Sequence, residues 1–424
     1  MSRTHAAICL AIVTLAGCAV GPDYKKPDAP LAEAWQIEPG WQLANPRDGE
    51  IKGNWWEIFA DPDLNALQEQ ALHSGQTMVI AQARVDQARA QANVANSAYF
   101  PRLGLQAGAA RNRTSADRPL SNYNTQNVSV IQNDFNAGFT VNYELDLFGR
   151  VRRQAEGAGA SAQQAQADFE NTRLILTAEL AADYFALCET DAEIDLLRQI
   201  LAAQNKALDY INTRHELGAA SGLDLNQQQG LTAATQTQLT LLTDQRARYQ
   251  NAIATLVGTP APNFKLAAKI QAIVIPVVPL TAPAALLERR PDIAATERAM
   301  AAANAQIGLA KSAFFPSLGL SGLYGSDSNT LPNLFSAPSV LWSLGVSATQ
   351  TLFDGGRIRA NVDFAEAGYQ QAVASYRQSV LVAFQEVQDG LNGSATLTQA
   401  AESAKVAADS AERSLGLSLD RYRS

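Results

Sequence analysis

The side chains that most often perform chemistry are few in this sequence and lie far apart. Imidazole and thiol groups occur only at His5, His73, His215, Cys9, Cys18 and Cys188. No two of the histidines stand at the spacing of a metal-binding pair, and no nucleophile, base and orienting group form a recognisable arrangement. The sequence therefore predicts no metal site, no cofactor and no enzymatic activity.

One cysteine stands in a context that indicates a covalent modification. Arg3 and His5 precede an apolar run over residues 6–16, which is followed closely by the letters LAGC. A basic start, a short apolar segment and small residues before the break are typical of an export signal, which we expect to span residues 1–17. The LAGC letters look like a bacterial lipobox, so we expect Cys18 to receive a lipid. A plain secretory signal with an incidental cysteine is the alternative.

The residue after Cys18 predicts which membrane would hold the lipid. Ala19 follows, rather than the aspartate that usually retains such lipoproteins at the inner membrane, so we expect the outer membrane. Removal of the signal would take Cys9 with it, and acylation would use Cys18. Cys188 would then be the one free thiol, which leaves no partner for an intrachain disulfide.

The composition restricts the class of protein further. The chain has 424 residues, with 7% aromatic and 17% charged side chains and a formal net charge of −8. The aromatic content is low for a set of conventional globular cores, yet the chain is too apolar for disorder. No basic stripe is present, so a nucleic-acid partner is not expected.

A nine-residue phrase occurs twice and predicts an internally duplicated architecture. Residues 97–105 read SAYFPRLGL, residues 312–320 read SAFFPSLGL, and seven of the nine letters agree. In each copy the proline ends a preceding helical pattern, because proline disfavours helical geometry in the residue before it. In the first copy we expect this helix to run from Leu64 to about Ala98. A two-residue alternation then begins.

Four segments alternate apolar and polar residues and therefore predict β-strands. They are residues 101–109, 135–147, 316–324 and 342–352, in two hairpin-like pairs. In the second segment the odd positions are apolar from Phe135 to Leu147, and the even positions are polar or glycine. A half-buried strand of a soluble sandwich is the alternative. One fully apolar face over this length, in an exported lipoprotein, favours a strand in a membrane.

A long helix follows the second strand and another follows the fourth. Val151 begins a series of apolar or small residues spaced alternately four and three apart, and Ile358 begins the same series 207 positions later. Such a heptad seam is typical of coiled-coil packing. The first helix continues to about Leu217, which is roughly 100 Å long at about 1.5 Å per residue. Residues 215–227 then turn into a helix that returns to about Val257.

Together these patterns divide the chain into five parts. They are a signal peptide (1–17), a lipid-anchored N-terminal extended segment (18–62), a first repeat (63–258), a proline-rich linker (259–282) and a second repeat (283–424). A sheet in a membrane cannot leave an edge unpaired, and four strands are too few to close a barrel, so several copies of the chain must share one. The residues alone allow two, three or four copies.

Long motifs spread over nearly the whole chain resemble one family. They read CAVGPDYKKP, WWEIFADPDLNALQEQAL, FTVNYELDLFGRVRR, LLERRPDIAATERAMAAANAQIGLAKSAFFPSLGL and TLFDGGRIRA. On these motifs the sequence resembles the TolC-like outer-membrane efflux proteins, in their lipoprotein branch. The resemblance implies a mixed α and β membrane protein. In its homotrimer the strands would form one shared β-barrel in the outer membrane, and the helices would form an α-barrel in the periplasm.

The same resemblance implies the function of an exit duct that performs no chemistry. Such a duct passively conducts small molecules (drugs, dyes, detergents or metals) to the exterior. They come from an inner-membrane pump, often of the resistance-nodulation-division class, through a periplasmic adaptor. The same architecture serving export of protein or polysaccharide is the alternative. A coiled-coil envelope tether without a channel is a third interpretation, which the alternation at 135–147 disfavours.

The resemblance also assigns a role to the turn between the first long helix and the return helix. Arg214, Gly218, Ser221 and Asp224 would belong to the periplasmic tip that meets the adaptor. An ordinary helix-turn-helix cap is the alternative, because glycine commonly ends a helix and Ser221 or Asp224 could start the next. Both interpretations can hold at once.

The second repeat ends where the first one turns. The sequence stops at Ser424, and family members carry a further return helix, so we expect a C-terminally truncated form that fails to restore drug resistance in a strain lacking its duct protein. Asp420, Arg421 and Tyr422 fall where the family places the contacts that close the entrance. A solvated, frayed helix end is the alternative for these three residues.

Overall fold

The computed structural model describes residues 21–26, 53–116, 129–270 and 290–423 of the chain. These residues form two compact units, each of which takes segments from both halves of the sequence. The first unit gathers described residues within 1–29, 87–164 and 296–378, and the second gathers those within 30–86, 165–295 and 379–424. The expected signal peptide and Cys18 lie outside the described residues.

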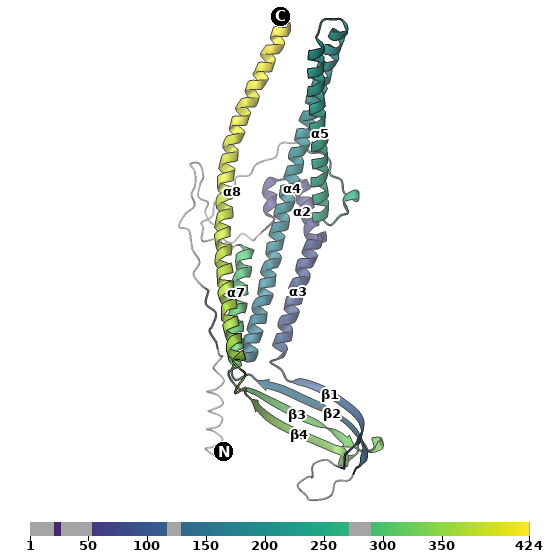
Figure 1. Ribbon diagram of the computed structural model, residues 1–424, viewed down its shortest axis with the longest axis vertical. Coiled ribbons are helices and arrows are strands. Elements are labelled where there is room, and N and C mark those ends of the chain that lie inside the picture. The colour runs from purple at the N-terminus through teal and green to yellow at the C-terminus, as the bar shows by residue number, and fades with distance from the viewer. Residues whose placement is uncertain (1–20, 27–52, 117–128, 271–289, 424) are drawn as a thin grey trace. The chain divides into compact units, whose positions relative to one another are not determined.

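Six longer helices and four strands make up most of the described chain (Figure 1). The helices are α2 (Pro62–Ser74), α3 (Gln76–Ser97), α4 (Arg150–Glu216), α5 (Gly222–Leu256), α7 (Pro291–Ser312) and α8 (Arg357–Arg423). The strands are β1 (Arg102–Arg113), β2 (Ile131–Leu145), β3 (Ser317–Ser328) and β4 (Val340–Thr349). Short 3-10 helices occur at η1 (Trp55–Phe59), η2 (Ala261–Asn263), η3 (Leu331–Asn333) and η4 (Ala337–Ser339).

The four strands form one antiparallel sheet in the order β1-β2-β3-β4 (Figure 1). The prediction of four strands is confirmed, but their grouping into two hairpin-like pairs is incomplete. β2 also pairs with β3, from Phe135 opposite Ser328 to Leu145 opposite Leu318. This pairing joins the two repeats, and a pattern within one strand carries no information about such a distant neighbour.

The ends of the strands differ from the ends of the alternating segments. β2 ends at Leu145 and β4 ends at Thr349, whereas the alternation continues to residues 147 and 352. Those predicted ends were wrong because the chain already turns there toward the first residues of a helix. At their other ends the strands extend beyond the predicted segments, since backbone pairing continues where the apolar pattern has stopped.

An aspartate after each of these two strands starts the following helix. Asp146 accepts hydrogen bonds from the backbone N–H groups of Val151 (3.1 Å) and Arg152 (2.8 Å). In the second repeat Asp354 accepts one from the backbone N–H of Ile358 (2.9 Å). The first N–H groups of a helix have no partner within the helix, so both aspartates satisfy donors that would otherwise be unpaired.

The two long helices that follow lie at nearly the predicted bounds, and their heptad series lies on the covered side. In α4, Val151, Ala155 and Leu176 are buried, and in α8, Val362 and Tyr376 are buried. A strip of small and apolar residues repeated about every 3.5 positions stays on one side of a helix, so the local pattern was sufficient. None of the described helices is long and apolar enough to cross a membrane.

The helix before β1 is interrupted, which the sequence pattern did not predict. A single helix was expected from Leu64 to about Ala98, but Gly75 adopts an extended conformation (φ −63°, ψ 123°) between α2 and α3. A Cβ atom at Gly75 would lie 2.3 Å from the carbonyl oxygen of Ala71 and 2.9 Å from that of Leu256. The break therefore depends on close backbone contact with the end of α5.

The second unit has a hydrophobic core where η1, α2, α4 and α5 meet. Trp56, Leu180, Tyr184, Ile253 and Val257 are among its buried residues. Because tryptophan and tyrosine bury large apolar areas, this cluster stabilises the unit strongly. The segment 18–62 was expected to be extended, but its last described part forms η1 and contributes Trp56 to this core.

In the first unit, a short N-terminal segment (residues 21–26) lies against α4 and α7. The buried Arg153 donates hydrogen bonds to the Asp23 carboxylate (2.9 Å) and to the carbonyl of Gly21 (3.3 Å). Asn304 donates to the carbonyl of Pro22 (2.9 Å). These hydrogen bonds hold residues 21–26 against the helices of the first unit.

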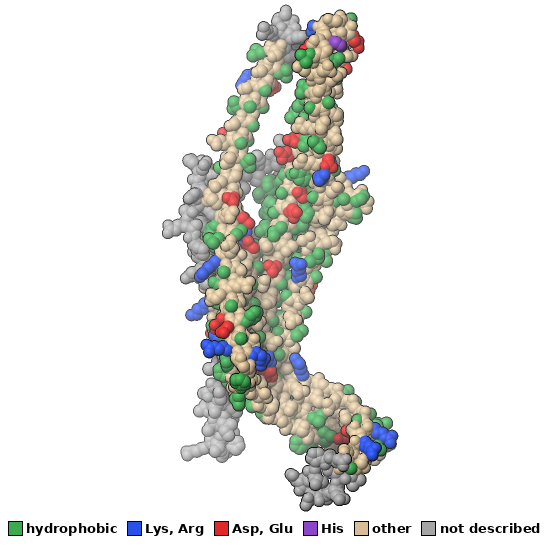
Figure 2. All heavy atoms as spheres, viewed as in Figure 1, with side chains coloured by type: hydrophobic (Ala, Val, Ile, Leu, Met, Phe, Trp, Pro, Cys, Tyr) green, Lys and Arg blue, Asp and Glu red, His purple; other side chains and the backbone are tan. Residues whose placement is uncertain are grey.

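The last part of α8 is a helix with exposed apolar side chains. Leu397, Val406, Leu415 and Leu417 are exposed, and Figure 2 shows hydrophobic side chains along this part of the helix. No described residue covers them. This part of α8 is therefore helical although no described residue packs against its apolar side chains.

Candidate functional site

One side of the sheet carries a row of large apolar side chains that crosses all four strands. Leu105 lies opposite Phe139, Phe139 lies opposite Tyr324, and Tyr324 lies opposite Trp342. All four side chains are exposed. We call this side of the sheet the apolar face. Alternation within each strand predicted such a face, and the register shows that the four strands present it together.

The other side of the sheet, the polar face, carries mostly amides, hydroxyls and glycines, with Leu323 and Leu341 among them. Its side chains include Gln106, Asn136, Thr140, Asn142, Ser321, Ser343 and Ser347. A strand with one exposed apolar face and one polar face suits a boundary between hydrocarbon and water. The sheet therefore has the chemistry of a wall between lipid and an aqueous space.

The junction between the sheet and the helices contains a cavity and an aromatic stack. Phe148 after β2 stacks on Phe315 before β3, with ring centroids 4.9 Å apart and planes 18° apart. Both rings line a cavity of about 190 Å³, together with the ion pair between Arg150 and Glu144. The same ion pair also lines a second cavity of about 430 Å³, together with Arg102. The pair is bidentate, since two nitrogens of Arg150 donate to the two carboxylate oxygens of Glu144. Such a pair fixes the direction in which α4 leaves the sheet.

The turn between α4 and α5 brings the four predicted tip residues together. Ser221 caps α5 by accepting a hydrogen bond from the Asp224 backbone N–H (3.1 Å), and the Asp224 carboxylate accepts one from the Ser221 backbone N–H (3.2 Å). Hydrogen bonds from Ser221 lower the pKa of the Asp224 carboxyl. Gly218 has a φ of +75°, which favours glycine. Arg214 donates to the carbonyl of Ala219 (3.1 Å).

Two further features of this turn were not predicted. The His215 Nδ1 atom lies 2.9 Å from the carbonyl oxygen of Ala220. Leu217 and Leu223 are exposed on the turn. The hydrogen bonds of the turn therefore cap the start of α5, and its two exposed leucines form a surface that a partner could contact.

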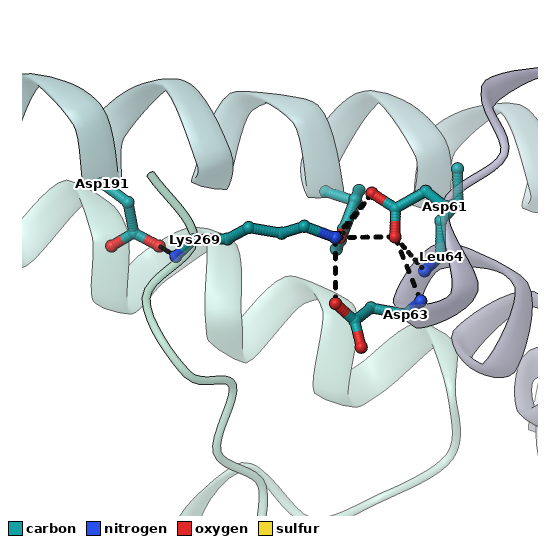
Figure 3. Close-up of polar contacts among 6 residues, drawn as sticks. Asp61, Asp63, Leu64, Asp191 and Lys269 are labelled. Atoms are coloured by element: carbon teal, nitrogen blue, oxygen red, sulfur yellow. Dashed lines mark hydrogen bonds and ion pairs between the residues drawn. The ribbon is translucent and has the colours of Figure 1, made fainter. Parts of the chain in front are cut away.

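A polar cluster in the second unit was missed at the level of sequence (Figure 3). The Lys269 ammonium lies 2.8 Å from both carboxylate oxygens of Asp61, 2.9 Å from a carboxylate oxygen of Asp63 and 3.0 Å from the Tyr184 hydroxyl. The Tyr184 hydroxyl donates to Asp61 (3.0 Å). Burial alone would lower the pKa of Lys269, but its hydrogen bonds to Asp61, Tyr184 and Asp63 outweigh this and raise it.

A second ion pair continues the cluster along α4. Asp191 accepts a hydrogen bond from the Lys269 backbone N–H (3.2 Å) and is paired with Arg246 of α5. Arg246 also donates to the carbonyl of Leu266 (3.0 Å). These contacts hold the segment after η2 against α4 and α5, which stabilises the unit.

Only part of this cluster had a signal in the sequence. Asp61 and Pro62 form a recognisable helix start, and the Asp61 carboxylate accepts hydrogen bonds from the backbone N–H groups of Asp63 (3.0 Å) and Leu64 (3.3 Å). Lys269 stands in a segment without a motif, so its contact with Asp61 could not be read from the sequence.

Some predicted site residues cannot be compared with the structure. Cys18 lies outside the described residues, and the side chains of Asp420, Arg421 and Tyr422 in the last turn of α8 are likewise outside the described part. Within the described ranges there is no group of three or more histidine, cysteine, aspartate or glutamate residues that could hold a metal ion.

Comparison with known proteins agrees with this arrangement. The family profile described as "Outer membrane efflux protein" matches residues 67–259 and 282–424. The probable efflux pump outer membrane protein SepC of Pseudomonas putida is 32% identical over 428 residues, which cover 99% of this chain and 88% of SepC. The outer membrane protein OprJ of Pseudomonas aeruginosa is also 32% identical, over 98% of this chain and 86% of OprJ.

Solved structures show the same fold. A membrane protein from Pseudomonas aeruginosa superposes with a TM-score of 0.85 at 30% identity, covering 96% of this chain and 90% of that one. The outer-membrane channel OprN superposes with a TM-score of 0.80 at 30% identity, covering 90% and 84%. The Campylobacter jejuni CmeC outer membrane channel, at 23% identity and a TM-score of 0.84, shares the fold. With its sheet, its long helices and nearly its whole length matched, the chain belongs to the outer membrane efflux protein family.

Proposed function

We propose that this protein is the exit duct of a tripartite efflux system and passively conducts small molecules from an inner-membrane pump and a periplasmic adaptor to the exterior. The observation that carries the proposal is a sheet with one apolar face, one polar face and two edges that pair with no described strand. Copies joined edge to edge would place the apolar face against lipid and the polar face around an aqueous lumen.

The size of the lumen limits the copy number, and the family resemblance selects it. Two copies would supply about eight strands, and a barrel of that size is filled by its own side chains, whereas three or four copies supply enough strands to enclose a passage. Of these we propose a homotrimer, as the resemblance to the TolC-like family implies. The molecular mass of the protein in detergent, measured by light scattering with the detergent contribution subtracted, tests this copy number. A mass of one or two chains would contradict it.

The duct itself is tested by attaching a charged group to a cysteine on either side of one strand, since only the group on the lumen side should obstruct the passage. Ser343 and Leu344 are neighbours on β4 that point to the polar and the apolar face. In planar bilayers, a negatively charged thiol reagent should lower the conductance of Ser343→Cys and leave that of Leu344→Cys unchanged. Absence of any conductance from the unmodified protein would refute the duct, and equal effects on both variants would refute the assignment of faces.

The turn that holds Arg214, Gly218, Ser221 and Asp224 is the proposed contact with the adaptor. A photo-reactive amino acid at Ser221 or Arg214 should form a cross-linked product with the periplasmic adaptor in cells. The matched control is Thr237, which is exposed on α5 away from the turn. Cross-linking from Thr237 as strong as that from Ser221 would show that the turn is not the contact.

The proposed membrane anchor is a lipid on Cys18, exposed after removal of residues 1–17. Radioactive palmitate should label the wild-type protein and not the Cys18→Ser variant. Cys188→Ser serves as the control, because Cys188 is buried in the second unit and should have no effect on labelling. Persistent labelling of Cys18→Ser would exclude this site.

Asp420, Arg421 and Tyr422 are the proposed contacts that close the entrance of the duct. Replacing each with alanine should raise the conductance of the resting channel and leave its maximal open conductance unchanged. Conductance equal to wild type in all three variants would support a solvated helix end instead.

The proposed cargo is small and chemically varied, and the duct performs no reaction on it. Relatives bear names that refer to toluene and to antibiotics, and drugs, dyes, detergents or metals form the corresponding class here. Liposomes that hold the purified protein should release a panel of such compounds faster than protein-free liposomes, and they should retain a large polysaccharide. Retention of the whole panel, with the protein present in the bilayer, would contradict this cargo class.

A further inference from the structure

A recess lies on the polar face of the sheet, at the end where the strands meet the helices. It is the cavity of about 430 Å³ that Arg102 lines, and this volume lies within the range of small-molecule sites. All of its lining residues belong to the first unit. Gly319 keeps it hollow, because a Cβ atom there would lie 2.9 Å from Oγ of Ser347.

A row of hydrogen-bond donors crosses three strands at this recess. Arg102 of β1 lies opposite Asn142 of β2, and Asn142 lies opposite Ser321 of β3. All three residues line the recess and are exposed. Guanidinium, amide and hydroxyl groups can all donate hydrogen bonds. One ligand could therefore accept hydrogen bonds from three neighbouring strands.

The charges around the recess leave one cation without a partner. Its charged lining residues are Arg102, Glu144 and Arg150. Glu144 and Arg150 neutralise each other through their bidentate pair. Arg102 has no ion pair with any residue in the described part of the chain. The recess therefore attracts anions, and a cationic ligand would meet a guanidinium without a free carboxylate.

One wall of the recess is apolar. Ala98 and Phe100, which precede β1, both line it, and Phe100 is 70% exposed. An exposed aromatic ring can stack on another flat ring, and an arginine can also stack on an aromatic face. The recess thus combines a site for a negative charge with a surface for a small apolar group.

We propose that this recess binds an amphiphilic anion, in which a carboxylate or a sulfonate is attached to a small apolar body. The anionic group accepts hydrogen bonds from Arg102, Asn142 and Ser321, and the apolar body lies against Phe100. This inference rests on the proposed function, because it takes the polar face to be the wall of the lumen. It adds a class of solute that this wall holds during passage.

The exposure of the donors suits a site inside a passage. Because the three donor side chains are exposed, water and salt screen their attraction for the anion. Binding should therefore be weak enough for rapid release. A deeply buried arginine would hold the same anion more tightly and obstruct the passage.

A cysteine in the donor row reports on occupancy of the recess without any need for conductance. In the purified protein in a neutral detergent, N-ethylmaleimide should modify Ser321→Cys at a rate that mass spectrometry can follow. Naphthalenesulfonate should slow this reaction. Naphthylmethylammonium, which has the same ring system and the opposite charge, should not. Inorganic sulfate should slow it less than naphthalenesulfonate does, because sulfate has no apolar body to contact Phe100.

Substitutions in the Ser321→Cys protein test the role of the guanidinium. In Arg102→Gln, the naphthalenesulfonate concentration that halves the reaction rate should rise by about threefold or more, since an exposed charge contact is lost. Arg102→Lys keeps the positive charge and should retain most of the protection. Arg111→Gln is the matched control, because Arg111 is exposed on the same strand but on the apolar face.

A second cysteine tests whether protection is confined to the recess. Asn112 is exposed on the polar face of β1, ten residues from Arg102, which is about 34 Å at about 3.4 Å per residue. Naphthalenesulfonate should leave the modification of Asn112→Cys unchanged. Equal protection of Asn112→Cys and Ser321→Cys would overturn the site.

The remaining outcomes are equally decisive. Equal slowing by the two naphthalene compounds, or slowing by neither, would overturn anion binding, and this comparison uses one protein, so it does not depend on the folding of Arg102→Gln. Unchanged protection in Arg102→Gln would overturn the role of Arg102. Protection by sulfate as strong as that by naphthalenesulfonate would overturn the amphiphilic class.

The test also separates this inference from the proposed duct. Conductance of the unmodified protein in planar bilayers reports on the duct alone. A protein that conducts but shows no anion-specific protection of Ser321→Cys contradicts the recess and leaves the duct standing. Protection without conductance contradicts the duct and leaves the anion site in place.

Discussion

The Lys269 ammonium lies 2.8 Å from both carboxylate oxygens of Asp61, a residue 208 positions earlier in the chain (Figure 3). Both side chains are largely covered, and the Tyr184 hydroxyl completes the contact. The pair links the start of α2 to the segment that follows η2. Both residues lie in the second unit, so a substitution of either one measures how much the ion pair contributes to the stability of that unit.

Removing the cation should destabilise the second unit. Lys269→Met leaves Asp61 covered without its charged partner, and we expect a loss of about 1–3 kcal/mol in the free energy of unfolding, between the values for surface and buried pairs. Urea unfolding in detergent, followed by the fluorescence of the core tryptophans, measures it. Lys265→Met is the control, because Lys265 is exposed nearby. Equal stability of both variants would contradict a stabilising role.

The contribution of Asp61 should depend on pH in the acid range. Burial raises the pKa of Asp61, but hydrogen bonds from Lys269 and Tyr184 outweigh burial and hold it below the ordinary value of 3.8. A lowered folded-state pKa stabilises above the unfolded-state value, and the stabilisation is lost as pH falls through the folded-state value. The difference in unfolding free energy between wild type and Asp61→Asn should therefore shrink below about pH 3.8. A difference that stays constant from pH 6 to about pH 2 would contradict this linkage.

A methyl group at Gly308 should release the N-terminal segment. A Cβ atom there would lie 2.8 Å from Cγ of Arg153, the residue that binds Asp23. Gly308→Ala should therefore speed cleavage by trypsin after Lys25, measured by mass spectrometry of the fragments. Gly368→Ala on α8 is the control, because nothing lies within 4 Å of its Cβ position. Unchanged cleavage of Gly308→Ala would show that the segment tolerates the methyl group.

Two glycines at the α4–α5 turn should respond differently to the same substitution. Gly218 has a φ of +75° and open space around its Cβ position, so Gly218→Ala should cost about 1–2 kcal/mol locally through backbone strain alone. Gly222 begins α5, where alanine is favoured. Amide hydrogen exchange across residues 217–224 should quicken in Gly218→Ala and slow in Gly222→Ala, and the reverse order would contradict the assignment.

The apolar face should contact lipid in the membrane. Trp342 is exposed on that face beside Tyr324, whereas Trp56 is buried in the second unit. The fraction of tryptophan fluorescence quenched by brominated lipid chains should therefore fall in Trp342→Phe, and it should not fall in Trp56→Phe, which removes an emitter that the lipid does not reach. If Trp342→Phe is quenched as strongly as wild type, the apolar face does not meet the hydrocarbon.

Much of this fold could be predicted because it depends on short-range periodicity. The alternation from Phe135 to Leu145 defines two faces of β2 wherever that strand is placed, and the heptad series from Val151 defines the covered side of α4. The tip is also local, since Ser221 and Asp224 are three residues apart and cap the helix that contains them. For the tip, however, this determines the conformation, and contact with an adaptor stays a prediction.

The features that escaped prediction all join residues far apart in the chain. Gly75 breaks a helix because the end of α5 approaches it, and β2 meets β3 across the boundary between the repeats. The segment around Lys269 has neither periodicity nor motif that indicates Asp61. Sequence patterns report which residues favour a helix, a strand or a face, but not which distant element will cover that face.

The sequence by itself determined the duplication, the type of each main element and the division of the strands into apolar and polar faces, because side-chain chemistry and the 2.0- and about 3.5-residue periods are local properties. Only the tertiary structure decided the order β1-β2-β3-β4, the stack of Phe148 on Phe315 and the ion pair of Lys269 with Asp61. Those contacts form between residues far apart in the sequence, and local sequence patterns do not specify which distant surfaces come close in space.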